Sequence, residues 1–201
     1  MASSQEQDPL APLVDVECPL TVAVVLGSSR PGRKGAAVAD WFVAQASSRD
    51  MKIDVIDLAA LRLRTDLTPT DDSRELAARV DAADAFVVVT PEYNHGYPAA
   101  LKTALDALRR EWAAKPVAFV SYGGLSGGLR AVEQLRAVVA ELHMVSLRDT
   151  VSFHQVAGCF DATGTPRDRV AAETAAAVLL DRLTWWGSAL RAARAGQPYA
   201  P

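Results

Sequence analysis

The stretch Ala85-Phe-Val-Val-Val-Thr-Pro-Glu-Tyr-Asn-His-Gly-Tyr-Pro98 decides the fold. Its first half, residues 85–90, is a continuous apolar run, which is typical of a strand buried on both faces of a parallel sheet. Its second half is a turn, because Pro91, Asn94 and Gly96 all favour irregular backbone. A helix is expected to begin near Pro98, since proline is tolerated in the first helical turn. Ligands of open α/β sheets bind where strands end, so this turn is a candidate binding loop.

Strand and helix patterns alternate outward from this stretch. Apolar or alternating runs predict further strands at residues 20–26, 52–58, 116–122 and within 145–153. Helical spacing predicts helices over 36–46, 98–110, about 127–142 and about 167–194, and N-cap residues at 71–73 predict one more that runs to residue 83. We expect Val170 on the apolar face of the last helix. Trp185 and Trp186 are expected in the core, and a position at an interface is the alternative. The pattern predicts an α/β, flavodoxin-like, doubly wound five-stranded parallel sheet of strand order 2-1-3-4-5, with helices on both faces.

The length and composition suit a single compact domain. The chain has 201 residues and is 50% hydrophobic, which is enough for one sizeable core. We expect this domain to span residues 19–195, followed by a short C-terminal tail at 196–201. Residues 1–18 are polar and acidic and contain prolines, so they predict a disordered N-terminal tail.

Several classes of function are disfavoured by the composition. The net charge of −3 and the absence of a basic stripe argue against nucleic acid as a partner. No apolar stretch approaches the ~20 residues that span a bilayer, so no membrane association is expected. The cysteines, Cys18 and Cys159, form no metal-binding motif, and the three histidines are scattered, so no metal site is predicted. A reduced, cytoplasmic setting is the simplest interpretation.

The loop after the first strand, Gly27-Ser-Ser-Arg-Pro-Gly-Arg-Lys-Gly35, has the composition of a phosphate site. Its glycines let backbone N–H groups converge at a helix start, where the helix dipole favours an anion. Ser28 adds a hydroxyl, and Arg30 can bind phosphate through paired charged contacts. The loop is neither the GxGxxG fingerprint nor a P-loop, because Arg33-Lys34 replaces Lys-Ser/Thr. The alternative is an ordinary polar turn with exposed arginines.

The loops after the third and fourth strands complete a candidate site at the same sheet edge. Tyr93 offers a flat ring, and Asn94 can both donate and accept hydrogen bonds while tolerating left-handed backbone. The fourth loop, residues 121–128, carries four glycines, which suits close approach of backbone to a ligand or a moving lid. Tyr122 could stack on a ring or meet its edge. The alternative for the third loop is a rigid turn whose tyrosine fills the core.

Charged residues on the following helices admit simpler interpretations. Lys102 and Asp106 are four residues apart, so they share a helix face. An exposed ion pair is slightly favoured over a position at a subunit interface. Arg130 and Arg136 are expected to be solvated.

Four short motifs together resemble the NADPH-dependent FMN reductase family, which includes quinone, chromate and azo-dye reductases. The matching motifs are Gly-Ser-x-Arg at 27–30, Pro-Glu-Tyr-Asn at 91–94, Leu-Lys-x-Ala-Leu-Asp at 101–106 and Gly-Gly-x-Arg at 127–130. The likeness covers roughly residues 21–153. It implies a flavodoxin-like fold that holds FMN tightly but without a covalent bond.

The resemblance also implies positions for the cofactor contacts. Ser28 and Arg30 would hold the FMN phosphate. Many family members have a serine in place of Gly35, so this chain lacks one hydroxyl at the phosphate site, and Arg33 or a backbone N–H would substitute for it. The residues implied to line the flavin ring and the ribityl chain, mostly through backbone, or to complete the pocket are Pro91, Glu92, Tyr93, Asn94, Ser121, Tyr122, Gly123 and Gly124.

The expected activity is that of an FMN-dependent NAD(P)H oxidoreductase. Hydride would pass from NADPH or NADH through FMN to a flavin, a quinone or a similar small acceptor, and no catalytic side chain is required. The resemblance implies a homodimer or homotetramer. One alternative is a flavin-bearing electron carrier or redox-responsive binding protein without significant turnover. Another is a flavin-free α/β domain that binds a different phosphate ester.

Overall fold

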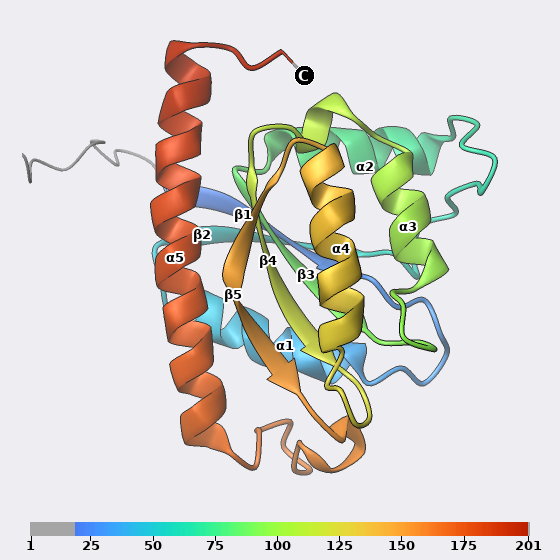
Figure 1. Cartoon of the computed structure of the whole chain (residues 1–201), viewed down its shortest axis with the longest axis vertical. Coiled ribbons are helices and arrows are strands. Elements are labelled where there is room, and N and C mark those ends of the chain that lie inside the picture. The colour runs from blue at the N-terminus through green and yellow to red at the C-terminus, as the bar shows by residue number, and fades with distance from the viewer. Residues whose placement is uncertain (1–18, 201) are drawn as a thin grey trace, which may run out of the picture.

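The structure, a computed structural model, describes residues 19–200 and contains one five-stranded parallel sheet (Figure 1). The strands are β1 (Leu20–Leu26), β2 (Met51–Asp57), β3 (Ala85–Pro91), β4 (Pro116–Tyr122) and β5 (Val145–Phe153). Their order across the sheet is β2-β1-β3-β4-β5, and every neighbouring pair is parallel. The predicted strand order 2-1-3-4-5 is therefore confirmed. In this order the chain reverses direction across the sheet between β1 and β3, which is where ligands bind in such folds.

Helices cover both faces of the sheet, as predicted. They are α1 (Gly35–Ala46), α2 (Asp71–Ala82), α3 (Ala99–Asp106), α4 (Leu129–Glu141) and α5 (Arg169–Gly196). Buried residues of α1 and α5 pack in one cluster, and those of α2, α3 and α4 pack in a second cluster on the opposite face. Two short 3-10 helices, η1 (Arg110–Trp112) and η2 (Val156–Gly158), follow α3 and β5.

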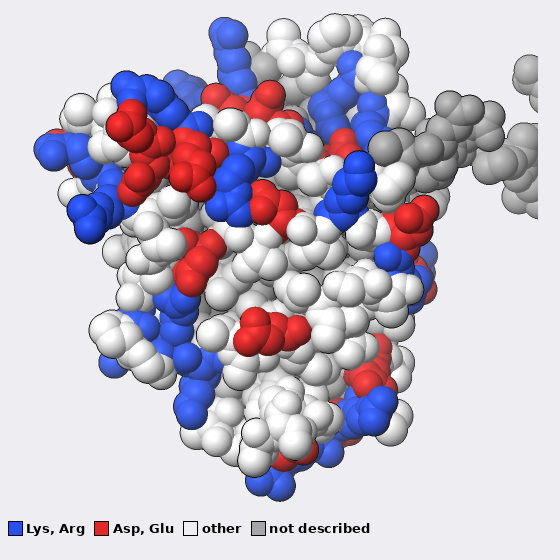
Figure 2. Space-filling view, turned by 180° about the vertical axis from the view of Figure 1, so that it is seen from behind, with Lys and Arg blue, Asp and Glu red and all other residues white. Residues whose placement is uncertain are grey.

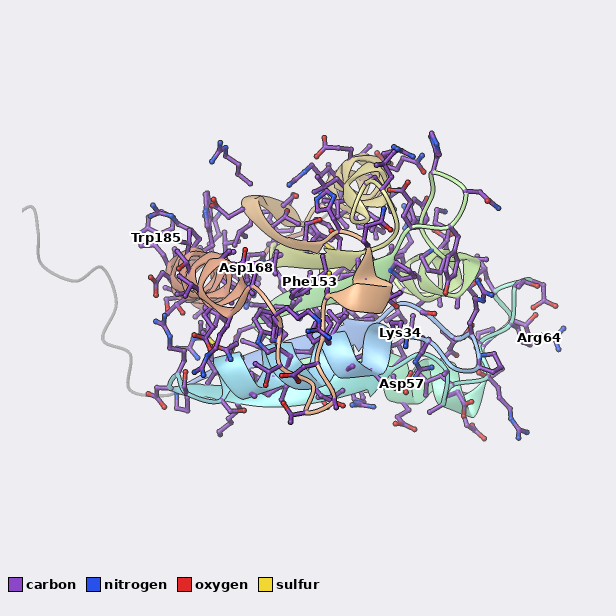
Figure 3. All side chains as sticks on the ribbon, turned by 90° about the horizontal axis from the view of Figure 1, so that it is seen from below. Lys34, Asp57, Arg64, Phe153, Asp168 and Trp185 are labelled. Carbon is purple, nitrogen blue, oxygen red and sulfur yellow. The ribbon has the colours of Figure 1, made fainter. Side chains whose placement is uncertain are left out.

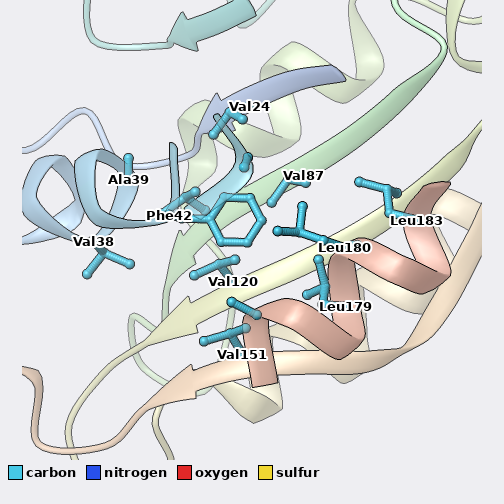
Figure 4. Packing of buried hydrophobic residues seen from close by; sticks show 14 of the residues in the cluster. Val24, Val38, Ala39, Phe42, Val87, Val120, Val151, Leu179, Leu180 and Leu183 are labelled. Carbon is cyan, nitrogen blue, oxygen red and sulfur yellow. The ribbon is translucent and has the colours of Figure 1, made fainter. Parts of the chain in front are cut away.

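Each core is built from alternate residues of the same strands. Val22 and Val24 of β1 face α1 and α5, while Ala23 and Val25 face the other layer. Phe42 of α1 lies in the middle of the first cluster, among side chains from several strands and α5 (Figure 4). Every residue of β3 is buried, which explains the continuous apolar run that marks it in the sequence.

The third helix is shorter than predicted. We expected it to reach residue 110, but α3 ends at Asp106 and η1 follows. The reason is Trp112, which is only 2% exposed and whose ring packs against Phe86 with centroids 4.9 Å apart. Its indole N–H donates to the carbonyl of Leu105 over 3.2 Å. The chain leaves the helix early because this large ring is buried under it.

The apolar face of α5 differs from the prediction at two positions. Val170 is 77% exposed and Trp185 is 57% exposed, so placing them on the apolar face and in the core was wrong. Trp186 is partly buried against the first cluster. Figure 3 shows Trp185 pointing away from the sheet. The buried residues recur at helical spacing along one stripe, and Trp185 lies outside it; the stripe comprises Ala172, Ala176, Leu179, Leu180, Leu183 and Gly187.

The surface and the chain ends add several observations. Basic and acidic side chains are interspersed on the face shown in Figure 2, which has no continuous basic stripe. Among residues 19–200, no helix has both the length and the apolar character needed to cross a membrane, and no cluster of potential metal ligands occurs. The predicted tail at 1–18 lies outside the described residues. Beyond α5, the Tyr199 hydroxyl lies 2.7 Å from Nδ1 of His143.

Candidate cofactor-binding site

The loop between β1 and α1 lies against β3 at the carboxyl edge of the sheet. The backbone N–H of Gly27 donates to the carbonyl of Val89 over 2.9 Å. The helix then begins at Gly35, and the side chain of the preceding Lys34 makes no capping hydrogen bond. The first N–H groups of α1 are therefore not capped by that side chain, which suits an anion at this helix terminus.

The loop after β3 is a tight turn that contacts the first loop. Tyr93 and Gly96 exchange two backbone hydrogen bonds of 2.9 and 3.0 Å. Asn94 and His95, between them, have positive φ angles of 49° and 67°, so Asn94 adopts the expected left-handed backbone. The Tyr93 hydroxyl lies 2.6 Å from the Ser28 hydroxyl. Tyr93 is therefore not a core residue but joins the two loops.

Arg30 and Arg33 have different environments within the first loop. The Arg30 guanidinium is exposed and lies over the Tyr93 ring, 5.3 Å from its centroid. Arg33 forms an ion pair with Asp57 at the end of β2. Its Nε atom is buried and has no hydrogen-bond partner within residues 19–200. Arg30 is thus free to meet an anion with its whole guanidinium, while Arg33 retains one unpaired donor.

The glycine-rich loop after β4 is held by its neighbours on two sides. The Ser121 hydroxyl, which is fully buried, donates to the carbonyl of Gly127 over 2.8 Å. From the β5 side, the N–H of Gln155 donates to Gly124 over 2.8 Å and that of Val156 to Gly123 over 2.9 Å. These bonds give the loop a defined position despite its glycines.

Glu92 fixes the same loop from the β3 side. Its side chain is 8% exposed and accepts hydrogen bonds from the Ser126 hydroxyl and the Arg130 backbone N–H. The Arg130 guanidinium completes an ion pair of 3.0 Å. Burial raises the pKa of the Glu92 carboxyl, but the Ser126 bond and the Arg130 charge outweigh it, so the net pKa is lowered. Arg130 is not simply solvated, as we had expected, because it links two of the sequence motifs.

Tyr122 reaches from the end of β4 to the start of α1. A Cβ atom added to Gly35 would lie only 2.4 Å from the Tyr122 hydroxyl oxygen. This hydroxyl is buried and has no hydrogen-bond partner of standard geometry among the described residues. Burial, together with the neighbouring Tyr93, raises the pKa of Tyr122 to about 12, although Ser28 and Arg33 act in the opposite direction.

The three loops meet in one cleft of about 380 Å³. Eight of the twelve predicted residues line it: Arg30, Arg33, Pro91, Glu92, Tyr93, Tyr122, Gly123 and Gly124. Ser28, Gly35 and Ser121 are buried next to this lining, and Asn94 is exposed at the tip of its turn. The structure therefore brings together eleven of the predicted positions and leaves Asn94 at the rim.

The prediction missed several residues around the cleft. Val156 of η2 lines it, as do Pro31, Gly32 and Lys34 of the first loop. The position of Val156 follows from the strand order, because β5 ends at the same sheet edge as β4. Arg136 was also expected to be solvated, but it donates to Ser146 and to backbone carbonyls of β5.

A larger hollow of about 530 Å³ lies between β5 and the start of α5. Its lining includes Phe153, Cys159 and Ala172 and none of the predicted residues. Because it lacks the uncapped helix start and the glycine-rich backbone of the smaller cleft, it is not a candidate phosphate site.

The residues of the smaller cleft fit FMN. The start of α1, the Arg30 guanidinium and two buried donors without partners supply what a phosphate dianion requires. The glycines of the β4–α4 loop leave room for a flat ring, and a Cβ on Gly124 would meet no atom within 4 Å. The cleft thus offers both kinds of group that such a ligand requires, polar groups for its anionic tail and aromatic groups for its planar head.

Comparisons with known proteins agree with this fit. The sequence model of the family described as NADPH-dependent FMN reductase matches residues 20–158. The chain is 34% identical over 162 residues to an NAD(P)H-dependent FMN reductase of Schizosaccharomyces pombe, covering 74% of this chain and 75% of the relative. It is 33% identical to an NADPH:quinone oxidoreductase of Arabidopsis thaliana, covering 80% and 89%.

The fold is also found in a solved structure. The flavoenzyme NAD(P)H:(acceptor) oxidoreductase FerB from Paracoccus denitrificans superposes with a TM-score of 0.68 at 24% identity, covering 84% of this chain and 97% of FerB. At that identity the likeness concerns the fold. The family model and the two relatives carry the assignment further, and they show that this chain belongs to the NADPH-dependent FMN reductase family.

Proposed function

We propose that this protein is an FMN-dependent NAD(P)H oxidoreductase that reduces a flavin, a quinone or a similar small acceptor. The observation that carries the proposal is the single cleft in which the loops after β1, β3 and β4 meet. The names of the relatives support the choice of acceptor, since one is a quinone oxidoreductase and another an FMN reductase. Both NADPH and NADH remain co-substrates under this proposal.

The cleft would hold FMN, which would supply the hydride-accepting and electron-donating chemistry between a reduced nicotinamide and the acceptor. The protein binds and orients the reactants. We assign the phosphate to Arg30, Ser28 and the start of α1, and the ring to the loops at Pro91–Asn94 and Ser121–Gly124. Because Tyr93 also bonds to Ser28, it connects the phosphate end of the site with the ring end. Backbone donors near the ring would stabilise negative charge that develops on it.

Steady-state turnover tests the proposal against its alternatives. The purified protein, reconstituted with FMN, is expected to oxidise NADPH or NADH continuously when a quinone such as menadione is supplied. A protein that binds FMN but does not turn over would instead be an electron carrier or a redox-responsive binding protein. A protein that stays colourless after FMN addition would be a flavin-free domain, and the proposal would be wrong.

Arg30 provides a sharper test of the phosphate end. The Arg30→Ala variant is expected to bind FMN at least about tenfold more weakly, because a charged hydrogen bond is lost. Turnover per bound FMN should change little, since Arg30 is assigned to the phosphate and not to the ring. Arg62→Ala serves as the control, because Arg62 is exposed and does not line the cleft. Full retention of FMN by Arg30→Ala would refute this role.

We also propose that the protein acts in the cytoplasm as a homodimer or homotetramer. The chemistry supports the setting, because a flavin reductase draws on the NAD(P)H pool, and Cys159 is a free thiol. The assembly rests on the family resemblance alone.

A further inference from the structure

Two polar atoms at the phosphate end of the cleft share an unusual property. The Tyr122 hydroxyl and Arg33 Nε are the only buried side-chain nitrogen or oxygen atoms within residues 19–200 that lack a hydrogen-bond partner. Tyr122 as a whole is only 4% exposed. A buried donor without an acceptor is costly, so such groups call for an explanation. A ligand that supplies the missing acceptor is one.

Gly35 explains how the Tyr122 hydroxyl comes to lie there. The Cβ of any other residue at position 35 would lie 2.4 Å from the hydroxyl oxygen and 3.2 Å from Cζ of the ring. Gly35 has no positive φ angle, so backbone conformation does not require glycine here. The space does. The Tyr122 hydroxyl thus occupies the volume that a side chain at the first position of α1 would fill.

The surroundings of this hydroxyl favour an anion. It lies at the start of a twelve-residue helix, where N–H groups and the helix dipole attract negative charge. Ser28 and Arg33 are close enough to influence its ionisation. The Ser28 hydroxyl, which bonds to Tyr93, lies near enough to lower the pKa of Tyr122 through a hydrogen-bond contribution. The Tyr122 hydroxyl nevertheless has no hydrogen bond of standard geometry among residues 19–200, so it is available to donate to a ligand. With its pKa raised to about 12, it stays protonated at any physiological pH.

We propose that the Tyr122 hydroxyl donates a hydrogen bond to the FMN phosphate, and that Gly35 is required because it makes room for this hydroxyl. This inference rests on the proposed function and deepens it. The hydroxyl that this chain lacks at position 35 is supplied from the end of β4, on a different element. Tyr122 then binds the phosphate and does not stack on the flavin ring.

Comparing FMN with riboflavin tests the role of Tyr122, because the two ligands differ only in the phosphate. The Tyr122→Phe variant is expected to bind FMN at least about tenfold more weakly than the wild type, as measured by quenching of flavin fluorescence. Its affinity for riboflavin should be unchanged. Equal losses for both ligands would place Tyr122 at the ring, and no loss for either would leave it without a role; both results overturn the proposal.

The stability of the flavin-free protein supplies a second readout. Since the hydroxyl makes no hydrogen bond of standard geometry to the part of the chain that the structure describes, flavin-free Tyr122→Phe should unfold at a temperature equal to or above that of the wild type. A purely structural role for the hydroxyl predicts the opposite result, which would overturn the proposal.

Gly35 is tested by coupling it to Tyr122. Gly35→Ala should weaken FMN binding because its Cβ displaces the hydroxyl, and it should spare riboflavin. Added to Tyr122→Phe, the same change should cost much less, since the nearest remaining ring atom lies 3.2 Å away. Additive losses would overturn the pairing of the two residues.

If the wild type bound neither FMN nor riboflavin, the proposed function itself would fail. That result is distinct from all the outcomes above, which concern the variants alone.

Discussion

Glu92 illustrates what a single side chain does in this site. The family resemblance places it along the flavin, mostly through its backbone, yet its carboxylate holds Ser126 and Arg130. Its backbone N–H is also engaged, with the carbonyl of Tyr122 over 3.2 Å. Glu92 therefore acts on the cleft chiefly by fixing the position of the β4–α4 loop.

Removing the Glu92 charge should lower stability in a manner that depends on pH. Its pKa is lowered in the folded protein, so its contribution is present above the pKa of the unfolded chain and is lost as the pH falls through the folded value. Glu92→Gln should therefore reduce the free energy of unfolding by about 1–2 kcal/mol at pH 7. The difference from the wild type should shrink towards pH 3, as measured by urea denaturation.

Glu75 offers a matched control for this prediction. Its carboxylate also contacts an arginine, Arg79 at 3.4 Å, but it is exposed on α2. Glu75→Gln should change the stability by no more than about 0.5 kcal/mol. A pH-independent loss in Glu92→Gln would show that packing, and not charge, connects the two loops.

At the scale of single residues, the sequence predicted which side chains lie near the cleft better than it predicted which of them contact one another. The loops at the strand ends singled out Glu92, Tyr93 and Tyr122, which line one cleft in the structure, because such loops are where ligands bind. The contact between Tyr122 and Gly35 was not predictable, since it depends on the direction of a side chain across two elements. The Glu92–Arg130 pair was missed for the same reason.

The junction between β4 and α4 depends on backbone that only glycine adopts freely. Gly128 precedes the helix with a φ angle of 87°, and a Cβ there would lie 2.8 Å from Ser121 Cβ and 2.9 Å from the Tyr122 nitrogen. The contact with backbone leaves little freedom for relief, so both conformation and space demand glycine at this position.

Gly128→Ala should destabilise the protein by at least about 2 kcal/mol, because it combines backbone strain with overpacking. Gly124→Ala, in the same loop, is the control. A Cβ at Gly124 meets no atom within 4 Å, and its φ angle is not positive. Thermal unfolding of both flavin-free variants measures the difference, and equal melting temperatures would contradict the argument.

Lys115, just before β4, contacts the end of α2 and makes the stability of the protein depend on pH in the alkaline range. Its ammonium group donates to the carbonyls of Val80 and Asp81 over 2.9 and 2.8 Å. Burial, aided by the charge of Arg194, lowers the pKa of Lys115 to about 8. The unfolded chain therefore holds a proton that the folded protein has released between about pH 8 and pH 10, and stability rises with pH in this window.

The wild type should accordingly gain about 2 kcal/mol in the free energy of unfolding from this group between pH 8 and pH 10. Lys115→Met lacks the titrating group, so its stability should not show this gain. The difference between the two pH profiles from guanidinium denaturation isolates the effect. Parallel profiles would mean that Lys115 remains charged when buried.

Strands and helix ends were predicted well where one local sequence pattern determines them. They were predicted poorly where burial of a large side chain competes with that pattern. All five strands lie where continuous or alternating apolar runs predicted them, because such runs are local signals. The start of α2 lies close to its predicted place, but its N-cap is Thr70 and not one of Asp71, Asp72 and Ser73. The end of α3 was misplaced because burial of Trp112 overrides helical spacing. Trp185 was misassigned because neighbouring tryptophans on one helix cannot both face the sheet.

The whole molecule follows from the strand order. With β1 and β3 adjacent at the centre of the sheet, loops that are far apart in the sequence meet at one edge without any special linker. The five alternating repeats suffice to predict this arrangement. Such a pattern within one chain does not indicate whether or through which surface chains associate, so the oligomeric state stays a proposal.

Association of identical chains is a property of the whole molecule that can be tested directly. One chain has a mass of 21.4 kDa, and the proposed assembly requires two or four times that value in solution. Sedimentation equilibrium at micromolar concentration should give a dimer or a tetramer. A single species at the mass of one chain, with and without FMN, would contradict the proposal.

The interlocked positions of Gly35 and Tyr122 have a consequence for the divergence of related sequences. Gly35 cannot be replaced alone, because a larger residue would meet the Tyr122 hydroxyl. Under the proposal, Tyr122 cannot lose its hydroxyl alone without weaker FMN binding. Descendants of this chain should therefore exchange the two positions together, and an ancestor with a bulkier amino acid at position 35 would have needed a different one at position 122. Epistasis of this kind would leave a correlated pair in any deep collection of orthologues.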